Sequence, residues 1–201
     1  MARQTKADLV SDFRRAQILD GARRSFGHHG LDATTVDQIA RTARVAKGTV
    51  YLYFRSKDEI LRQALAEGLA ALERTTVPAI AAPAPIDEKL QRFLRSTLDY
   101  FDRNREFIEL CQLELRADMR RKARQKFGRI YAAQARAWQA ALERAMGDGT
   151  IVHADARHAA LVIVSLAHGL AIQRLRGWTK VPLEADVALA STLLLKGLSV
   201  R

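Results

Sequence analysis

Residues 30–61 read GLDATTVDQIARTARVAKGTVYLYFRSKDEIL. Their apolar residues recur at intervals of three and four, which predicts short helices. The first should begin at Thr34, a good N-cap residue, and the second should cover residues 46–54 with Val50 and Phe54 on its buried side. The chain between them allows only a tight turn. Two short helices joined in this way form a helix-turn-helix, whose second helix can enter the major groove of DNA.

The two short helices carry the side chains that this arrangement requires. Apolar residues for the inward faces are Val36, Ile39, Ala40, Val45 and Val50. Hydrogen-bonding residues left for the outward face of the second helix are Lys47, Thr49, Tyr51 and Tyr53. We therefore expect this second helix, the recognition helix, to contact DNA.

The rest of the chain predicts an all-α fold of about nine helices, because helical spacing recurs and period-two alternation is absent. One helix should precede the pair over residues 11–28, with Gly30 as its stop. Another should follow over residues 56–74, and the prolines of residues 75–85 should form a loop. Further helices are expected over residues 87–102, 105–116, 120–146, 155–176 and 183–198.

The segment from Ile18 to Leu61 resembles the TetR family of transcriptional regulators. The resemblance rests on TTV at residues 34–36, GTVY at residues 48–51 and FRSK at residues 54–57. It implies an amino-terminal DNA-binding domain followed by a helical domain that binds a ligand and dimerises.

The resemblance also implies roles for single residues. Contacts to DNA phosphates are implied for Thr35, Tyr51 and Lys57. Contacts to base edges or nearby phosphates are implied for Lys47, Thr49 and Tyr53. Gly48 would let the backbone come close to the duplex. Phosphate contacts fix the register of a protein on DNA, and base-edge contacts specify the sequence.

Two positions depart from the usual pattern of the family. Arg44 stands where members usually have glycine, so we expect a positive φ there, which costs roughly 1 kcal/mol for a residue with a side chain. Ala46 stands where many members have Ser or Thr, so the recognition helix should lose about 1 kcal/mol of capping. Both positions bear on the geometry of the turn.

The chain is strongly basic, with 33 Lys and Arg against 22 Asp and Glu and a formal net charge of +11. This excess favours polyanionic partners, either nucleic acid or an anionic membrane surface. The helix-turn-helix favours double-stranded DNA. A helical protein that binds nucleic acid without sequence preference remains an alternative.

Cys111 is the only cysteine, so no internal disulfide can form and a cytoplasmic location is the simplest expectation. The longest apolar run, residues 159–172, is interrupted by Ser165 and His168 and should be too short to span a bilayer. The five histidines lack metal-ligand spacing, and no nucleophile elbow or phosphate-binding loop is present. We expect no membrane partner, metal, cofactor or enzymatic activity.

The last two predicted helices are apolar on nearly all sides. Their apolar residues include Leu161, Val162, Ile163, Leu166, Leu170, Ile172, Val187, Leu193, Leu194 and Leu198. Such helices must be covered by their own domain and by a second subunit. The last two helices form the dimer interface in the TetR family, so the resemblance implies a homodimer on a palindromic operator.

The helices between the two ends carry residues that could line an apolar cavity for an unknown small-molecule ligand. These candidate ligand-binding residues are Phe93, Tyr100, Phe101, Phe107, Cys111, Tyr131 and Trp138. Each of them could equally belong to a solid core. A ligand bound there would favour a conformer whose recognition helices are wrongly spaced, and so would release DNA.

The sequence thus predicts a helix-turn-helix DNA-binding domain over residues 1–60 and a helical ligand-sensing and dimerisation domain over residues 61–201. The expected function is that of a dimeric repressor released by a ligand. Transcriptional activation remains an alternative.

Overall fold

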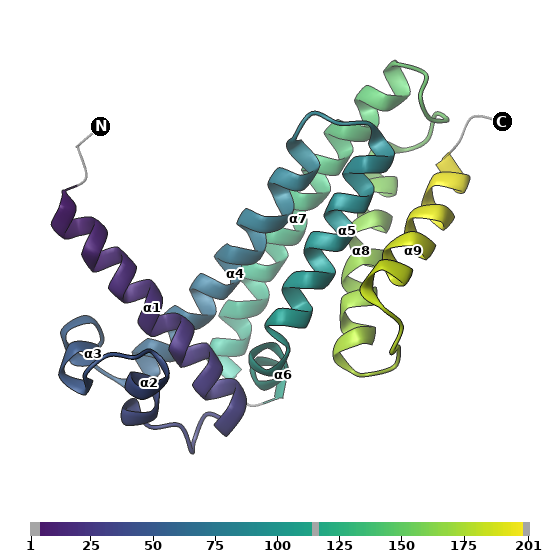
Figure 1. The fold of residues 1–201 in the computed structure, drawn as a ribbon. Helices are drawn as coiled ribbons and strands as arrows, with labels where there is room; N and C mark the ends of the chain where they lie inside the picture. The colour runs from purple at the N-terminus through teal and green to yellow at the C-terminus, as the bar shows by residue number, and fades with distance from the viewer. Residues whose placement is uncertain (1–4, 114–116, 199–201) are drawn as a thin grey trace. The chain divides into compact units, whose positions relative to one another are not determined.

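The computed structural model of the chain describes residues 5–113 and 117–198. Within these residues the chain forms nine helices and no strand, which confirms the predicted all-α fold (Figure 1). The helices are α1 (Lys6–His29), α2 (Val36–Thr42), α3 (Lys47–Tyr53), α4 (Lys57–Ala81), α5 (Ile86–Arg103), α6 (Arg105–Leu113), α7 (Ala117–Gly147), α8 (Ala156–Leu175) and α9 (Leu183–Leu198).

The described residues fall into two compact units. The amino-terminal unit is drawn from residues 1–68 and 105–123, and the carboxy-terminal unit from residues 69–104 and 124–201. Helices α4 and α7 each contribute to both units. Helix α6 belongs to the amino-terminal unit, because it packs against α1. The division of functions after residue 60 stays a prediction.

The amino-terminal unit is built around one apolar cluster, to which the two short helices contribute as the sequence predicts. Its buried members are Ile18, Leu19, Ala22, Phe26, Ile39, Ala40, Val50, Phe54, Ile60, Leu61, Ala64, Phe107 and Met119. Because α2 and α3 are too short to be stable alone, this shared cluster fixes the orientation of α3.

The first helix begins earlier than its apolar pattern predicts. Thr5 caps α1, and its hydroxyl accepts a hydrogen bond from the backbone N–H of Asp8 at 3.2 Å. The Asp8 carboxylate accepts from the Thr5 backbone N–H at 3.0 Å, which completes a capping box. The helix ends at Gly30, whose φ is 81°. The polar cap, and not the start of the apolar stripe, therefore sets the first residue of α1.

The predicted cap of the second helix is wrong by one residue. Thr35 caps α2 and forms a capping box with Gln38. Thr34 is buried instead, and its hydroxyl donates to the carbonyl oxygens of Ser25 at 3.0 Å and of Gly30 at 2.6 Å. Thr34 thus ties the loop before α2 to the end of α1, and Thr35 is left on the surface.

The turn between α2 and α3 has the geometry expected from its two unusual residues. Arg44 adopts a φ of 56°, and it is the only non-glycine residue with a positive φ in the described part of the chain. Ala46 caps α3 without a side-chain hydrogen bond. The turn is held from outside, because the Gln17 side chain donates to the carbonyl oxygen of Ala43 at 2.7 Å.

Helix α4 continues through the region that was predicted to be a loop. It reaches Ala81 and contains Pro78, although a proline inside a helix costs about 3 kcal/mol. Packing explains the difference, because Leu72, Thr76 and Ile80 lie one turn apart and are almost completely buried. Buried contacts on three successive turns outweigh the disruption by Pro78.

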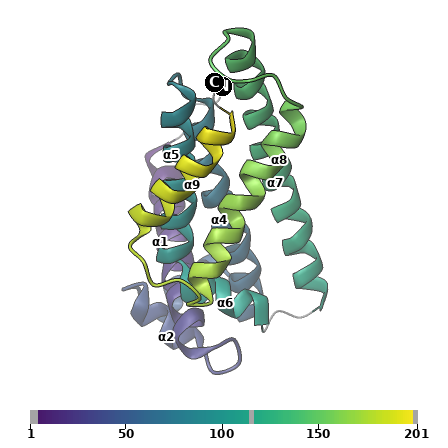
Figure 2. The same cartoon turned by 90° about the vertical axis from the view of Figure 1, so that its right-hand side faces the viewer.

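Helices α5, α8 and α9 pack together in the carboxy-terminal unit (Figure 2). Arg174 of α8 joins all three helices, since its guanidinium donates to Asp102 of α5 at 2.6 Å and to Asp186 of α9 at 2.7 Å. The hydrogen bonds to Asp102 and then Asp186 raise the pKa of Arg174. The side chains of Arg174 and Asp186 are largely buried, so this ion-pair cluster fixes the register of the three helices.

Helix α8 is longer and more apolar than a simple surface helix. Helix α8 has 20 residues, and an 18-residue window within it has a mean hydropathy of 1.3, so by length and composition alone it could cross a membrane. The helix extends beyond the apolar run of residues 159–172 at both ends, and the expectation that this run does not span a membrane stays a prediction. The helix packs against α5 and α9, and a core helix passes the same test. Its composition is weak evidence for a membrane span.

Candidate functional site

The surface of α3 presents a mixed polar and apolar face. Lys47 and Gly48 are exposed in its first turn, and one turn later Tyr51 is 51% exposed and Leu52 is 83% exposed. Val50 and Phe54 face the core and are fully buried. The buried contacts of Val50 and Phe54 fix one side of α3. The opposite side of the helix is therefore a rigid exposed surface.

The exposed face of α3 differs from the predicted one at three positions. Thr49 is half-buried, and Tyr53 is half-buried and packs against the apolar cluster. Leu52 is exposed, and sequence reasoning did not assign it to the outward face. The helical period contains the signal, since Leu52 follows Gly48 by four residues. The DNA-contacting roles of Thr49 and Tyr53 stay predictions.

Lys47 forms an ion pair with Asp37, which links α3 to α2. Its ammonium nitrogen lies 2.8 Å from the Asp37 carboxylate oxygen. This hydrogen bond raises the pKa of Lys47. Both side chains are about half exposed, so the pair is screened by solvent and can be exchanged for a stronger anion such as a phosphate.

Two helix amino-termini lie near α3 and carry the other predicted phosphate contacts. Thr35 is exposed at the start of α2. Lys57 begins α4, and its ammonium donates to the carbonyl oxygens of Leu31 at 2.7 Å and of Asp32 at 3.1 Å. Ser56 caps the same helix, because its hydroxyl accepts from the Glu59 backbone N–H at 3.1 Å. Lys57 thus holds the loop before α2 in place, and its contact with a phosphate stays a prediction.

Packing within the described residues does not require a glycine at position 48. A Cβ atom at this position would meet no atom of the described residues within 4 Å. An exposed glycine on the presented face of α3 leaves room for another molecule to approach the backbone.

The structure divides the predicted ligand-binding residues between the two units. Phe107 lies in the apolar cluster of the amino-terminal unit. The carboxy-terminal unit contains Phe93, Tyr100, Phe101, Tyr131 and Trp138. The side chain of Cys111 lies outside the described part of the structure. Residue type alone could not assign these residues to one unit or the other, because an aromatic residue on a buried helix face gives the same sequence pattern in both.

The aromatic residues of the carboxy-terminal unit form two groups. Phe93 and Trp138 are fully buried and meet edge to face, with ring centroids 5.6 Å apart. Phe101 and Tyr131 both contact His168, at centroid distances of 6.1 Å and 5.6 Å. Sequence reasoning did not assign His168 to this group, although its place on an apolar helix was visible.

His168 is enclosed by rings, and this burial lowers its pKa to about 4. Above pH 6.5 the imidazole is neutral in the folded and the unfolded chain. As the pH falls through 6.5, only the unfolded chain binds the proton, until the folded chain binds it near pH 4. We expect the free energy of unfolding to fall by about 3 kcal/mol over this window and to stay constant below it, as far as His168 contributes.

Urea unfolding between pH 4 and pH 7.5, for the wild type and His168→Phe, measures this contribution as a difference. Titration of other groups is common to both proteins and cancels. Parallel stability curves would contradict a buried neutral imidazole.

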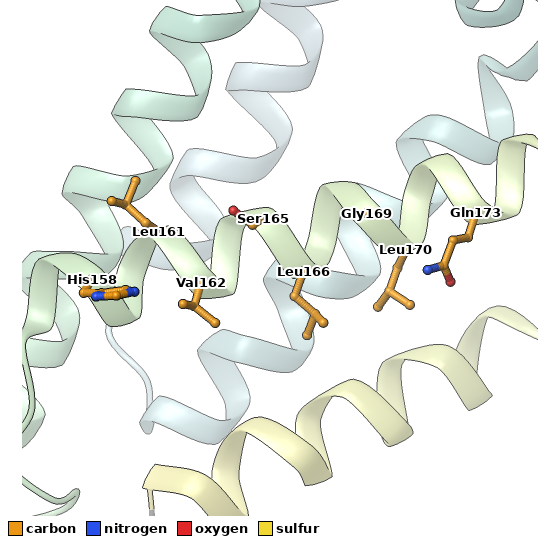
Figure 3. Close-up of a pocket in the computed structure, with 8 residues that line it drawn as sticks. All are labelled: His158, Leu161, Val162, Ser165, Leu166, Gly169, Leu170 and Gln173. Carbon is orange, nitrogen blue, oxygen red and sulfur yellow. The ribbon is translucent and has the colours of Figure 1, made fainter.

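One face of α8 forms an apolar groove (Figure 3). Figure 3 shows Val162, Leu166 and Leu170 on the same side of the helix. The neighbouring helix α9 adds Leu189 and Leu193, which are 60% and 63% exposed. We call Val162, Leu166, Leu170, Leu189 and Leu193 the α8–α9 face. Val162, Leu189 and Leu193 are exposed, and Leu166 and Leu170 are half-buried.

Comparison with known proteins identifies the amino-terminal unit. The sequence model of the family described as "Bacterial regulatory proteins, tetR family" matches residues 18–64. The HTH-type transcriptional regulator YhgD of Bacillus subtilis is 30% identical over 99 residues, which cover 49% of this chain and 52% of that protein. The fatty acid metabolism regulator protein of Bacillus subtilis is 31% identical over 100 residues, covering 50% and 52%. The chain thus spans about half the length of these curated relatives.

Solved structures extend the likeness to the whole fold. The transcriptional regulator FadR from Bacillus subtilis, solved in complex with stearoyl-CoA, is 25% identical and matches with a TM-score of 0.68 over 90% of this chain and 98% of that chain. The TetR family transcriptional regulator PfmR from Thermus thermophilus is 24% identical and matches with a TM-score of 0.62 over 91% and 99%.

Proposed function

The chain belongs to the TetR family of bacterial regulatory proteins, and we propose that it acts in the cytoplasm as a homodimeric repressor released from its operator by a small molecule. The observation that carries this proposal is the rigid face of α3, with Lys47, Tyr51 and Leu52 exposed on a helix that the core holds by its opposite side. Regulation of transcription, and not catalysis, is the proposed activity.

The proposed DNA contacts combine phosphate and base recognition. Thr35 and Lys57 at two helix amino-termini, with Tyr51 of α3, would bind phosphates. Lys47, Thr49 and Tyr53 would face base edges or nearby phosphates, and the open space at Gly48 would admit the duplex. Leu52 is placed to pack against a thymine methyl group. The net charge of +11 supports a polyanionic partner.

The proposed dimer uses the α8–α9 face. In a single chain Leu189 and Leu193 are exposed and Leu166 and Leu170 are half-buried, and burial against a second copy would remove this apolar area from water. Gly169 lies in the groove, and a Cβ there would meet no described atom within 4 Å, so a second helix can approach closely. A two-fold dimer would place two α3 helices on successive major grooves of a palindromic operator.

The proposed ligand site lies in the carboxy-terminal unit, among Phe93, Phe101 and Trp138. The structural neighbour FadR was solved in complex with stearoyl-CoA, so ligand binding is compatible with this fold. Binding would shift the population toward a conformer that does not fit the operator. A repressor acts by occluding a promoter, and ligand binding would then restore transcription.

The contribution of α3 to DNA recognition can be measured by fluorescence anisotropy on DNA from upstream of the gene and on unrelated DNA. Lys47→Ala and Tyr51→Ala are each expected to weaken binding to the upstream DNA roughly tenfold and to change binding to unrelated DNA much less. Lys180→Ala removes an exposed lysine of the carboxy-terminal unit and is the control, with no expected change. Equal losses on both DNAs would favour a nonspecific binder, because only salt-dependent affinity would then be removed.

A further inference from the structure

The interior of the carboxy-terminal unit contains polar atoms that lack hydrogen-bond partners among the described residues. They are Oγ1 of Thr97, Oε1 of Gln134, Nε1 of Trp138, Oγ of Ser191, and both ring nitrogens of His168. Thr97, Gln134 and Trp138 are fully buried, and His168 is 7% exposed. A buried polar group without a partner costs about 1–3 kcal/mol, and native proteins contain few of them. Five such side chains in one unit therefore require an explanation.

Four of the five side chains, those of Thr97, Gln134, Trp138 and His168, lie in one layer. On α5, Phe93, Thr97 and Phe101 follow one another at intervals of one turn and share a face. At one end of this face Phe93 contacts Trp138 of α7. At the other end Phe101 contacts His168 of α8. Thr97 therefore lies between the two aromatic groups.

Helix α7 supplies the opposite side of the same layer. Phe127 contacts the His168 ring at a centroid distance of 5.0 Å, and Tyr131, Gln134 and Trp138 follow on the same helix face. The Gln134 amide is fixed, because its Nε2 donates to the Thr76 hydroxyl at 2.7 Å. Its carbonyl oxygen is left as an acceptor. We call Phe93, Thr97, Phe101, Phe127, Tyr131, Gln134, Trp138 and His168 the polar-aromatic layer.

The chemistry of the layer defines what would complement it. None of its side chains carries a charge at pH 7, since burial keeps the His168 imidazole neutral. The Trp138 N–H can only donate, the Gln134 oxygen can only accept, and the Thr97 hydroxyl and the neutral imidazole can do both. A hydroxyl group both donates and accepts, so it matches this set. Aromatic rings would pack edge to face against the surrounding phenylalanines.

Other ligand classes fit less well. A carboxylate or phosphate would be desolvated here without a positive charge from the layer to balance it. An alkyl chain would fill space but would leave the four polar side chains unpaired. The balance of donors and acceptors therefore selects a neutral molecule.

We propose that the polar-aromatic layer binds an uncharged aromatic molecule that carries at least one hydroxyl group. This inference rests on the proposed function, since it names the class of ligand that would release DNA. Thr97, Gln134, Trp138 and His168 are buried, so the residues around them must separate to admit the ligand. Binding is therefore coupled to a movement of α5, α7 and α8 against one another.

The test uses 1-naphthol as probe and isothermal titration calorimetry on the full-length protein. The comparison compounds are naphthalene, 1-naphthoate and stearoyl-CoA. We expect 1-naphthol to bind at least about tenfold more tightly than naphthalene or 1-naphthoate, because one good hydrogen bond contributes about that factor. Absence of 1-naphthol binding, or equal binding of naphthalene, overturns the proposal. Binding of stearoyl-CoA in preference to 1-naphthol also overturns it.

The Thr97→Val substitution tests whether 1-naphthol binds at the polar-aromatic layer. Valine has nearly the shape of threonine and removes only the unpaired hydroxyl, so we expect the Tm to rise while the affinity for 1-naphthol falls about tenfold. Thr75→Val makes the same change on an exposed face of α4 and should leave the affinity for 1-naphthol unchanged. A lowered Tm for Thr97→Val would mean that the hydroxyl already has a partner, and would contradict the proposal. So would unchanged 1-naphthol affinity.

DNA binding, measured on the same preparation by anisotropy, separates this inference from the proposed function. If the protein binds its operator but not 1-naphthol, the proposed function stands and the proposed ligand class is overturned. If the protein binds 1-naphthol through Thr97 but shows no DNA preference, the proposed ligand class stands and the proposed regulatory function is overturned.

Discussion

Replacement of Gly21 by valine is expected to abolish specific DNA binding. A Cβ at Gly21 would lie 2.7 Å from the Cβ of Ala43 and 2.8 Å from its backbone nitrogen, closer than real Cβ atoms approach. Gly21 is thus where α1 crosses the end of α2, and any side chain there must displace α2 and the α3 helix that follows. We expect a loss of about 3 kcal/mol in the stability of the amino-terminal unit, and a loss of operator affinity of at least about a hundredfold.

The Gly21→Val effect can be separated from general unfolding. Both tryptophans, Trp138 and Trp178, lie in the carboxy-terminal unit, so their fluorescence reports on that unit alone. We expect native tryptophan emission together with lost DNA binding. Gly128→Val is the matched control, because Gly128 is exposed on α7 and a Cβ there meets no described atom within 4 Å. Wild-type operator affinity in Gly21→Val would contradict the close packing of α1 on α2.

Leu193→Glu is expected to convert the proposed dimer into monomers. Leu193 is 63% exposed on the α8–α9 face, one turn from Leu189. In the proposed dimer a glutamate at this position would be buried without a partner, at a cost on the order of several kcal/mol. A monomer contacts one half of a palindrome, so operator affinity should fall at least about a hundredfold. Sedimentation velocity and anisotropy measure the two effects.

The control for this change is Leu9→Glu. Leu9 is 54% exposed on α1, outside the α8–α9 face, so the variant should sediment as the wild type does. Dimers of Leu193→Glu at low micromolar concentration would contradict the proposed interface.

Much of the fold could be predicted because caps and apolar periodicity agree locally. Asp155 caps α8 through the backbone N–H of His158 at 2.9 Å, as its residue type suggests. Ser56 does the same for α4, and α9 has the predicted bounds of residues 183–198. In these segments no tertiary contact opposes the local preference, so sequence reasoning succeeds.

Sequence reasoning was wrong where tertiary contacts override a local preference. The prolines after Thr75 indicated a loop, but the buried contacts of Thr76 and Ile80 keep α4 helical past Pro78. Thr34 and Thr35 are equally good caps by type, and the choice depends on the Ser25 carbonyl, which only the folded chain brings near. Such partners are distant in sequence and leave no local pattern.

For the candidate site, the sequence allowed the helix and its exposed face to be predicted. The order of buried and exposed positions on α3 follows from the helical period, but sequence reasoning placed Tyr53 outside and did not assign Leu52 to the outward face. In the carboxy-terminal unit the aromatic residues could be identified from the sequence. Their grouping around His168 could not be predicted, because it joins helices far apart in the sequence.

Sequence-specific DNA binding through α3 is measured most simply with the wild-type protein. Fluorescence anisotropy at about 150 mM salt compares binding of the purified protein to DNA from upstream of its own gene with binding to unrelated DNA of equal length. A preference of roughly 10³-fold or more is the predicted result. Equal and steeply salt-dependent binding to both DNAs would contradict the claim, because charge alone would then account for the interaction.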